Sequence, residues 1–97
     1  MLTSKQRSRL ASLAQKLPDL LQLGKAGPSP TLVARLDRLL SEHELVKLRF
    51  VDFKETRDEL ARSLAVGTAS ELVRLIGNTA IFWRRHPDPE KQKIQLV

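Results

Sequence analysis

The sequence has 97 residues, of which 41% are hydrophobic and 29% charged, with no cysteine and a formal net charge of +6. A chain of this length fits one domain and leaves little room for a large enclosed active site, so it favours a binding module. The lack of cysteine excludes a disulfide framework, a zinc ribbon and a cysteine nucleophile. No apolar stretch reaches the length of a membrane span or follows the basic N-terminus as in a signal peptide, so we expect a cytoplasmic protein without membrane association.

The positive charge is concentrated in the N-terminal part of the chain. Residues 1–38 carry seven Lys and Arg against two Asp, whereas residues 39–97 carry ten basic side chains against nine acidic ones. Clustered cations gain affinity for polyanions by displacing the counterions around phosphates, so this asymmetry predicts one surface that faces a polyanion. A generally basic, solvated surface is the alternative interpretation.

The N-terminal part predicts a helix, a short strand and a second helix. Residues 4–17 have apolar side chains at spacings of three and four, with Thr3 or Ser4 as the cap, and the restriction that Pro18 places on its predecessor ends this helix. The apolar run at 20–23 predicts a buried strand. Ser29 is the expected N-cap of the next helix, with Pro30 at its first position and an apolar face through Leu40.

The C-terminal part predicts a strand, a helix and a hairpin. Residues 45–50 alternate as in a half-buried strand, and residues 54–66 predict a helix that Asp52 can cap and that Gly67 can close in the left-handed conformation. Gly77-Asn78 separates two further strands, 71–76 and 79–84, as in a two-residue hairpin turn.

The predicted order is therefore α-β-α-β-α-β-β in the α/β (α+β) class. We expect a two-layer arrangement with a mixed four-stranded sheet, because crossover helices and a terminal hairpin require both parallel and antiparallel pairs, and helices over one face. Residues 1–85 are expected to form the single domain. Residues 86–97 are expected to form an extended tail, in which Ile94 and Leu96 can dock.

The strongest candidate for chemistry is the strand–loop–helix unit around Gly24-Lys25-Ala26-Gly27. Glycines allow a tight turn and the close approach of a phosphate, free N–H groups of the loop and helix start can bind the anion, and Lys25 adds a full charge. Behind the loop, Thr31, Arg35 and Arg38 form a row on the predicted helix. A tight structural turn explains the spacing of the two glycines equally well. The motif is neither a nucleotide-binding P-loop nor a dinucleotide fingerprint.

Other candidates are weaker. Four cations (Lys47, Arg49, Arg84 and Arg85) could extend a basic surface, although solvated strand positions explain Lys47 and Arg49 better. Core packing is the better account of Phe50 and Phe82, whereas Trp83 alternates away from Phe82 and could be partly exposed for base stacking.

No enzymatic site is expected. His43-Glu44 begins like a zinc-binding H-E-x-x-H motif, but Lys47 stands where the second ligand would be. With two histidines and no cysteine, the chain shows no catalytic, metal-binding or cofactor-binding machinery, so none of these is predicted.

Four sequence blocks resemble the CRM domain family (chloroplast RNA splicing and ribosome maturation), most closely its stand-alone bacterial YhbY-like RNA-binding members. The blocks are the Leu-Thr-Ser-Lys-Gln-Arg start, Leu23-Gly24-Lys25-Ala26-Gly27, Glu42-His43-Glu44-Leu45-Val46-Lys47, and Leu75-Ile76-Gly77 followed by Ile81-Phe82-Trp83-Arg84. The resemblance covers about residues 3–85. It implies a fold like the C-terminal domain of translation initiation factor 3, RNA binding through the G-x-x-G loop, and association with precursors of the large ribosomal subunit.

The chain departs from that family where Pro28-Ser29-Pro30 follows the second glycine in place of Leu-Thr. Both prolines lack an N–H, so the expected backbone donors are those of Lys25, Ala26, Gly27, Ser29 and Thr31. We therefore expect a monomeric, non-enzymatic RNA-binding protein that contacts large-subunit rRNA and takes no small-molecule substrate. The alternative is an interaction module for an acidic protein, in which the glycine loop is only a turn. The expected RNA-binding residues are Gly24, Lys25, Ala26, Gly27, Ser29, Thr31, Arg35, Arg38 and, in the first helix, Lys5, Arg7 and Arg9.

Overall fold

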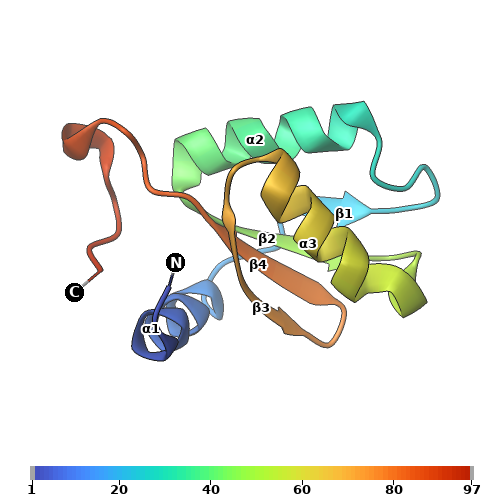
Figure 1. Ribbon diagram of the computed structural model, residues 1–97, viewed down its shortest axis with the longest axis horizontal. Coiled ribbons are helices and arrows are strands. Elements are labelled where there is room, and N and C mark those ends of the chain that lie inside the picture. The colour runs from blue at the N-terminus through green and yellow to red at the C-terminus, as the bar shows by residue number, and fades with distance from the viewer. Residues whose placement is uncertain (1, 97) are drawn as a thin grey trace.

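The computed structural model describes residues 2–96, and these form three α-helices and one four-stranded sheet in the expected order (Figure 1). The helices are α1 (Ser4–Ala14), α2 (Pro30–His43) and α3 (Arg57–Gly67), and the strands are β1 (Leu21–Leu23), β2 (Leu45–Phe50), β3 (Glu71–Ile76) and β4 (Thr79–Trp83). Two short 3₁₀ helices, η1 (Lys54–Thr56) and η2 (Pro89–Lys91), precede α3 and follow β4.

The sheet is mixed, which confirms the prediction. Its strand order is β1-β2-β4-β3, with β1 parallel to β2 and the other pairs antiparallel. The hairpin between β3 and β4 turns at Gly77-Asn78, where Gly77 alone takes a positive φ of 57°. Because β1 and β2 are parallel, their carboxyl ends lie at the same end of the sheet, and the segments that follow them are neighbours there.

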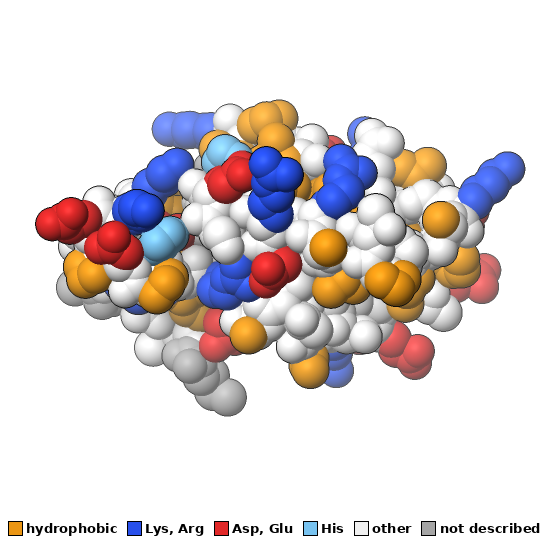
Figure 2. Space-filling view, turned by 90° about the horizontal axis from the view of Figure 1, so that it is seen from above, with side chains coloured by type: hydrophobic (Ala, Val, Ile, Leu, Met, Phe, Trp, Pro, Cys, Tyr) orange, Lys and Arg blue, Asp and Glu red, His pale blue; other side chains and the backbone are white. Residues whose placement is uncertain are grey.

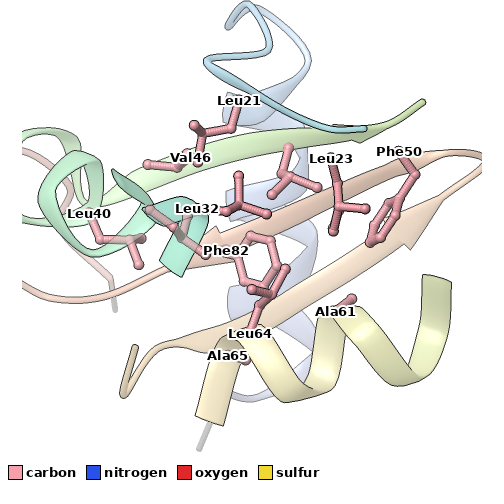
Figure 3. Packing of buried hydrophobic residues seen from close by; sticks show 13 residues of the cluster. Leu21, Leu23, Leu32, Leu40, Val46, Phe50, Ala61, Leu64, Ala65 and Phe82 are labelled. Carbon is pink, nitrogen blue, oxygen red and sulfur yellow. The ribbon is translucent and has the colours of Figure 1, made fainter. Parts of the chain in front are cut away.

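One face of the sheet carries the larger core, beneath α2 and α3 (Figure 3). Side chains alternate along β2, so Val46, Leu48 and Phe50 point into this core, where they meet Leu36 of α2 and Leu64 of α3. Phe50 and Phe82 are fully buried, which confirms them as core residues. Burial of each such side chain contributes about 1.5–3 kcal/mol.

Helix α1 covers the opposite face of the sheet (Figure 1), and a second cluster of buried side chains lies beneath it. Leu10 and Ala14 of α1 pack there with Leu45, Ile81 and Trp83 of the sheet. The expectation of two layers, with helices over one face only, is therefore wrong for α1. The alternating strands leave apolar side chains on both faces, and the second set needs a cover as well.

Two helix ends differ from the predictions. Helix α1 begins with Thr3 as its N-cap but ends at Ala14 rather than at residue 17. Leu17 is exposed, so no buried apolar contact stabilises a further helical turn. Helix α3 begins after η1, and the Asp52 carboxylate accepts a hydrogen bond from the Phe53 N–H instead of capping α3.

The end of α3 also differs from the prediction, because Gly67 lies inside the helix and Ala69 takes the left-handed conformation (φ 52°). The Ala69 N–H donates to the carbonyl of Val66 and the Ser70 N–H to that of Ala65, which is the hydrogen-bond pattern of a Schellman motif. The Thr68 hydroxyl is buried and donates to the Leu64 carbonyl. Together these hydrogen bonds determine where α3 ends.

The segment 86–96 follows β4 and is held by a buried carboxylate, that of Glu44. Glu44 is only 1% exposed and lies between α2 and β2 with a left-handed φ of 63°. Its Oε2 accepts the His86 N–H at 2.7 Å, and its Oε1 accepts those of Lys93 and Ile94 at 2.6 and 3.1 Å. Ile94 and Leu96 pack on the α1 cluster, so the tail is docked in the way that the sequence allowed.

Candidate nucleic-acid interface

The segment Gly24-Lys25-Ala26-Gly27 forms a tight turn between β1 and α2. The Gly27 N–H donates to the Gly24 carbonyl at 2.9 Å, and Gly27 has a φ of 68°, a left-handed conformation that glycine adopts without strain. Beyond the turn, the Ser29 hydroxyl accepts the Leu32 N–H at 3.2 Å and so caps α2, with Pro30 at the first helical position. The predicted cap and helix start are confirmed.

Five backbone N–H groups were expected to face an anion, and two of them are used inside the turn. Gly27 donates to Gly24, and Ser29 donates to the carbonyl of Gly27 at 2.9 Å. The expectation that these two groups are available is wrong, because the turn needs both to close. Within residues 2–96, the N–H groups of Lys25, Ala26 and Thr31 have no hydrogen-bond acceptor.

The two glycines of the turn differ in what requires them. At Gly27 a Cβ would be strained by the positive φ and would lie 3.4 Å from the Phe53 ring. At Gly24 the φ is not left-handed, and a Cβ would meet no atom within 4 Å. Neither packing nor backbone geometry therefore requires glycine at position 24, and the space beside it is open.

The cations of the turn and of α2 are exposed. Within the described residues, Lys25 and Arg35 form no ion pair or hydrogen bond through their side chains. Arg38 Nε lies 3.2 Å from Glu42 Oε1, with its side chain 82% exposed. Such an exposed pair contributes about 0.3–0.5 kcal/mol, so a phosphate can replace the carboxylate at little cost.

Seen from the side of α2, the Lys and Arg side chains do not form a continuous patch (Figure 2). Acidic and hydrophobic side chains lie between them. One of the acids of α2, Asp37, already has a partner, because its Oδ1 accepts a hydrogen bond from Arg84 at 2.6 Å. The Arg84 charge therefore offsets that of Asp37, which lowers the positive potential around the α2 cations less than the sequence alone indicates.

Helix α1, which carries the three predicted cations, lies across the sheet from α2 and α3 (Figure 1). The Arg7 guanidinium donates to the carbonyls of Leu72 and Val73, the latter at 2.9 Å, where β3 departs from regular pairing. Arg7 therefore has a structural partner, and Arg9 reaches the Gln95 carbonyl at 3.4 Å. The α2 row begins directly after the turn in the chain, whereas the helix that carries Lys5, Arg7 and Arg9 lies on the other face of the sheet.

Two of the weaker cation candidates, Lys47 and Arg84, also have structural partners. Lys47 donates to the Leu17 carbonyl at 3.0 Å, and Arg84 joins α2 to the turn after α3 through Asp37, Ser41 and the Thr68 carbonyl. Trp83 is 8% exposed, with the Arg85 guanidinium 5.3 Å from its ring centre, so it is a core residue and not an exposed stacking surface.

Phe53 belongs to this end of the molecule and was not singled out from the sequence. The Val51 and Asp52 N–H groups donate to the Leu23 carbonyl, which ties the segment after β2 to the end of β1. The Phe53 ring thereby comes to Gly27, and the residue as a whole is 41% exposed. A signal existed, since parallel neighbouring strands put the segments that follow them at one edge.

No three His, Asp or Glu side chains of residues 2–96 are grouped as metal ligands would be. Over the same residues, no helix is long and apolar enough to cross a membrane.

A strand, a glycine turn and a capped helix place free N–H groups and exposed cations next to one another, which are the donors and charges that an anion needs. The chain belongs to the CRS1/YhbY (CRM) domain family, whose model matches residues 2–84. It is 32% identical over 97 residues to the "Probable RNA-binding protein YqeI" of Bacillus subtilis, covering 99% of both chains. It is 31% identical over 91 residues to the "Probable RNA-binding protein PA4753" of Pseudomonas aeruginosa, covering 93% of this chain and 88% of that protein.

A solved structure agrees with the fold. The solution structure of the Staphylococcus aureus protein SAV1595 superposes with a TM-score of 0.81 at 31% identity, covering 98% of this chain and all of that one. The family predicted from the four sequence blocks and the predicted fold class are therefore confirmed.

Proposed function

We propose that the chain is a non-enzymatic cytoplasmic RNA-binding protein that binds ribosomal RNA as a monomer during assembly of the large subunit. The observation that carries the proposal is the Gly24–Gly27 turn, with its free N–H groups and its exposed Lys25. The names of the relatives from Bacillus subtilis and Pseudomonas aeruginosa and the net charge of +6 support RNA as the polyanion. Ribosome assembly rests on the resemblance to the CRM family.

In this proposal each part of the turn has a physical task. The N–H groups of Lys25, Ala26 and Thr31 hold the oxygens of one backbone phosphate, and the Lys25 ammonium neutralises its charge. The absence of a side chain at Gly24 lets the sugar–phosphate backbone approach, which explains a glycine that the protein itself does not require. Arg35 and Arg38 of α2 then contact neighbouring phosphates. Contacts of this kind position RNA without reading its sequence, so RNA shape supplies the selectivity.

The α1 cations stay in the proposal as a second contact surface, in which Lys5 and Arg9 contact RNA and Arg7 adds its charge while its guanidinium stays bound to the β3 carbonyls. They lie on the other face of the sheet, so the proposal does not require one short helical segment of RNA to contact both the glycine turn and α1. A folded rRNA that surrounds the domain could contact both faces.

The test is the affinity for a structured large-subunit rRNA fragment, measured across a salt series. Lys25→Glu is compared with Lys91→Glu, a matched control that makes the same change of charge at an exposed lysine of η2. We expect Lys25→Glu to weaken binding at least tenfold and to reduce the salt slope by about 0.9 or more, the value of one duplex phosphate contact. The control should change affinity about threefold or less, as an effect of net charge alone.

Gly24→Ala separates this proposal from the alternative in which the loop is only a turn. The added Cβ has open space, so the unfolding free energy should stay within about 1 kcal/mol of the parent, whereas RNA affinity should fall. Unchanged RNA binding by both Gly24→Ala and Lys25→Glu would refute the loop as the phosphate site. A wild-type protein that binds no rRNA fragment would refute the proposed function and favour an acidic protein partner.

A further inference from the structure

Phe53 lies in an unusual position for an aromatic residue. Its backbone is left-handed, with φ 57° and ψ 34°, a conformation that is unfavourable for a bulky side chain. The surroundings hold it there, since its N–H donates to Asp52 Oδ1 at 2.7 Å and its carbonyl accepts the Thr56 N–H at 3.1 Å. Phe53 is absent from both core clusters and remains 41% exposed. The segment is thus fixed in a way that presents the ring at the surface.

The ring lies against the glycine turn. Its Cε2 and Cζ atoms are 3.4 and 3.5 Å from the point where a Cβ of Gly27 would be, which is ordinary van der Waals contact, so the ring lies directly beside the turn. The segment 51–56 also lines a surface hollow of about 490 Å³. An exposed aromatic ring, a hollow and an anion-binding turn therefore meet at one end of the sheet.

This combination matches the two ends of a nucleotide. A base and its phosphate are joined through a single sugar, so a phosphate at Lys25 and Ala26 puts the attached or adjacent base near the turn. Aromatic side chains bind bases by stacking, and they do so only where the base is free of its neighbours. Within a paired helix both faces of a base are already covered.

We propose that Phe53 stacks on one unpaired base of the bound RNA and that the site selects a single-stranded or bulged nucleotide next to the phosphate held by the turn. The proposal rests on the proposed function, because it takes the Gly24–Gly27 turn as the phosphate site. It adds the class of RNA element that the turn recognises.

The experiment compares two rRNA-derived hairpins, one with a single bulged 2-aminopurine and one fully paired. Wild type should bind the bulged RNA about tenfold more tightly, within the range that stacking on one aromatic gives, and should quench the 2-aminopurine fluorescence. Phe53→Leu keeps an apolar side chain against Gly27 but has no aromatic face, so it should lose both the preference and the quenching. Phe53→Tyr should keep both. Val66→Ala is the control, since Val66 is 83% exposed on α3 and should not matter.

Each outcome decides the proposal. Equal weakening of both RNAs by Phe53→Leu would mean that the ring only supports the turn, and wild-type preference in Phe53→Leu would mean that it does not stack. Either result overturns stacking and leaves RNA binding at the turn intact, which Lys25→Glu tests separately. If wild type binds neither RNA, both proposals fail. Thermal melts show whether each variant folds. If Phe53→Leu does not fold, Phe53→Met replaces it as a second non-aromatic variant.

Discussion

Exchanging two residues at the end of α3 should stabilise the protein. Gly67 lies in the last helical turn, and Ala69 takes the left-handed position that follows the helix. Helices favour alanine inside and glycine at the left-handed position after the end, so this chain has the two residues in the reverse of the favoured order. The double variant Gly67→Ala, Ala69→Gly restores it.

The magnitude follows from the local geometry. At position 67 a Cβ would meet only Val33 Cγ1, at an ordinary contact distance of 3.9 Å, so alanine should gain about 0.5–1 kcal/mol in helix propensity. At position 69, alanine in the left-handed region costs about 1–2 kcal/mol, and the greater freedom of glycine in the unfolded chain returns about 0.5–1 of it. The sum is about 1–2 kcal/mol, which corresponds to a Tm increase of roughly 6–12 °C for a domain of this size.

The assay is urea unfolding of the parent, both single variants and the double variant, followed by circular dichroism and checked by thermal melts. Gly77→Ala is the control in the opposite direction, since Gly77 has a φ of 57° in the hairpin and alanine there should be destabilising. A loss of stability in Ala69→Gly would refute the left-handed assignment of Ala69. A loss in Gly67→Ala alone would show that α3 ends before residue 67.

Two further changes test the hydrogen bonds of the buried Glu44 and the geometry of the glycine turn. Glu44→Gln should lower the unfolding free energy by about 2 kcal/mol, because the amide NH₂ must face at least one of the N–H groups that donate to the carboxylate. Hydrogen exchange should accelerate at the Lys93 and Ile94 amides, and unchanged exchange would show that Glu44 does not hold this segment. Gly27→Ala should lower the unfolding free energy by about 1–2 kcal/mol, because of its φ of 68°, whereas Gly24→Ala should not; equal urea midpoints for the two variants would contradict the geometry of the turn.

The elements that the sequence predicted best are those determined by local signals. Helix α2 has a serine cap, a proline at its first position and a regular apolar period, and both its cap and its start are as predicted. Strand β2 alternates through its whole length, and its ends agree with the prediction. Two of the three helix ends that differ from the predictions depend on tertiary contacts. Leu17 stays exposed after α1, and the buried Thr68 hydroxyl binds the end of α3.

The face that α1 covers could not be read from its own sequence, since its apolar stripe would pack equally well on either side of the sheet. The sheet decides this, because Leu45, Val73 and Ile81 point away from α2 and α3 and need a cover of their own. That placement then separates the cations of the first helix from the glycine turn. A count of basic residues along the chain cannot show such a division.

The candidate site shows the same limit in another form. The sequence predicts the glycine turn because the residues that form it, Gly24 to Gly27, are consecutive in the chain. Phe53 is 26 positions beyond Gly27 in the chain and reaches the turn only through the parallel pairing of β1 and β2. The sequence indicates a free cation at Arg7, but β3 departs from regular pairing between Leu72 and Arg74, and the carbonyls of Leu72 and Val73 accept hydrogen bonds from the Arg7 guanidinium. Charge and spacing identify which residues can bind an anion, and the pairing of strands decides which of them share one surface.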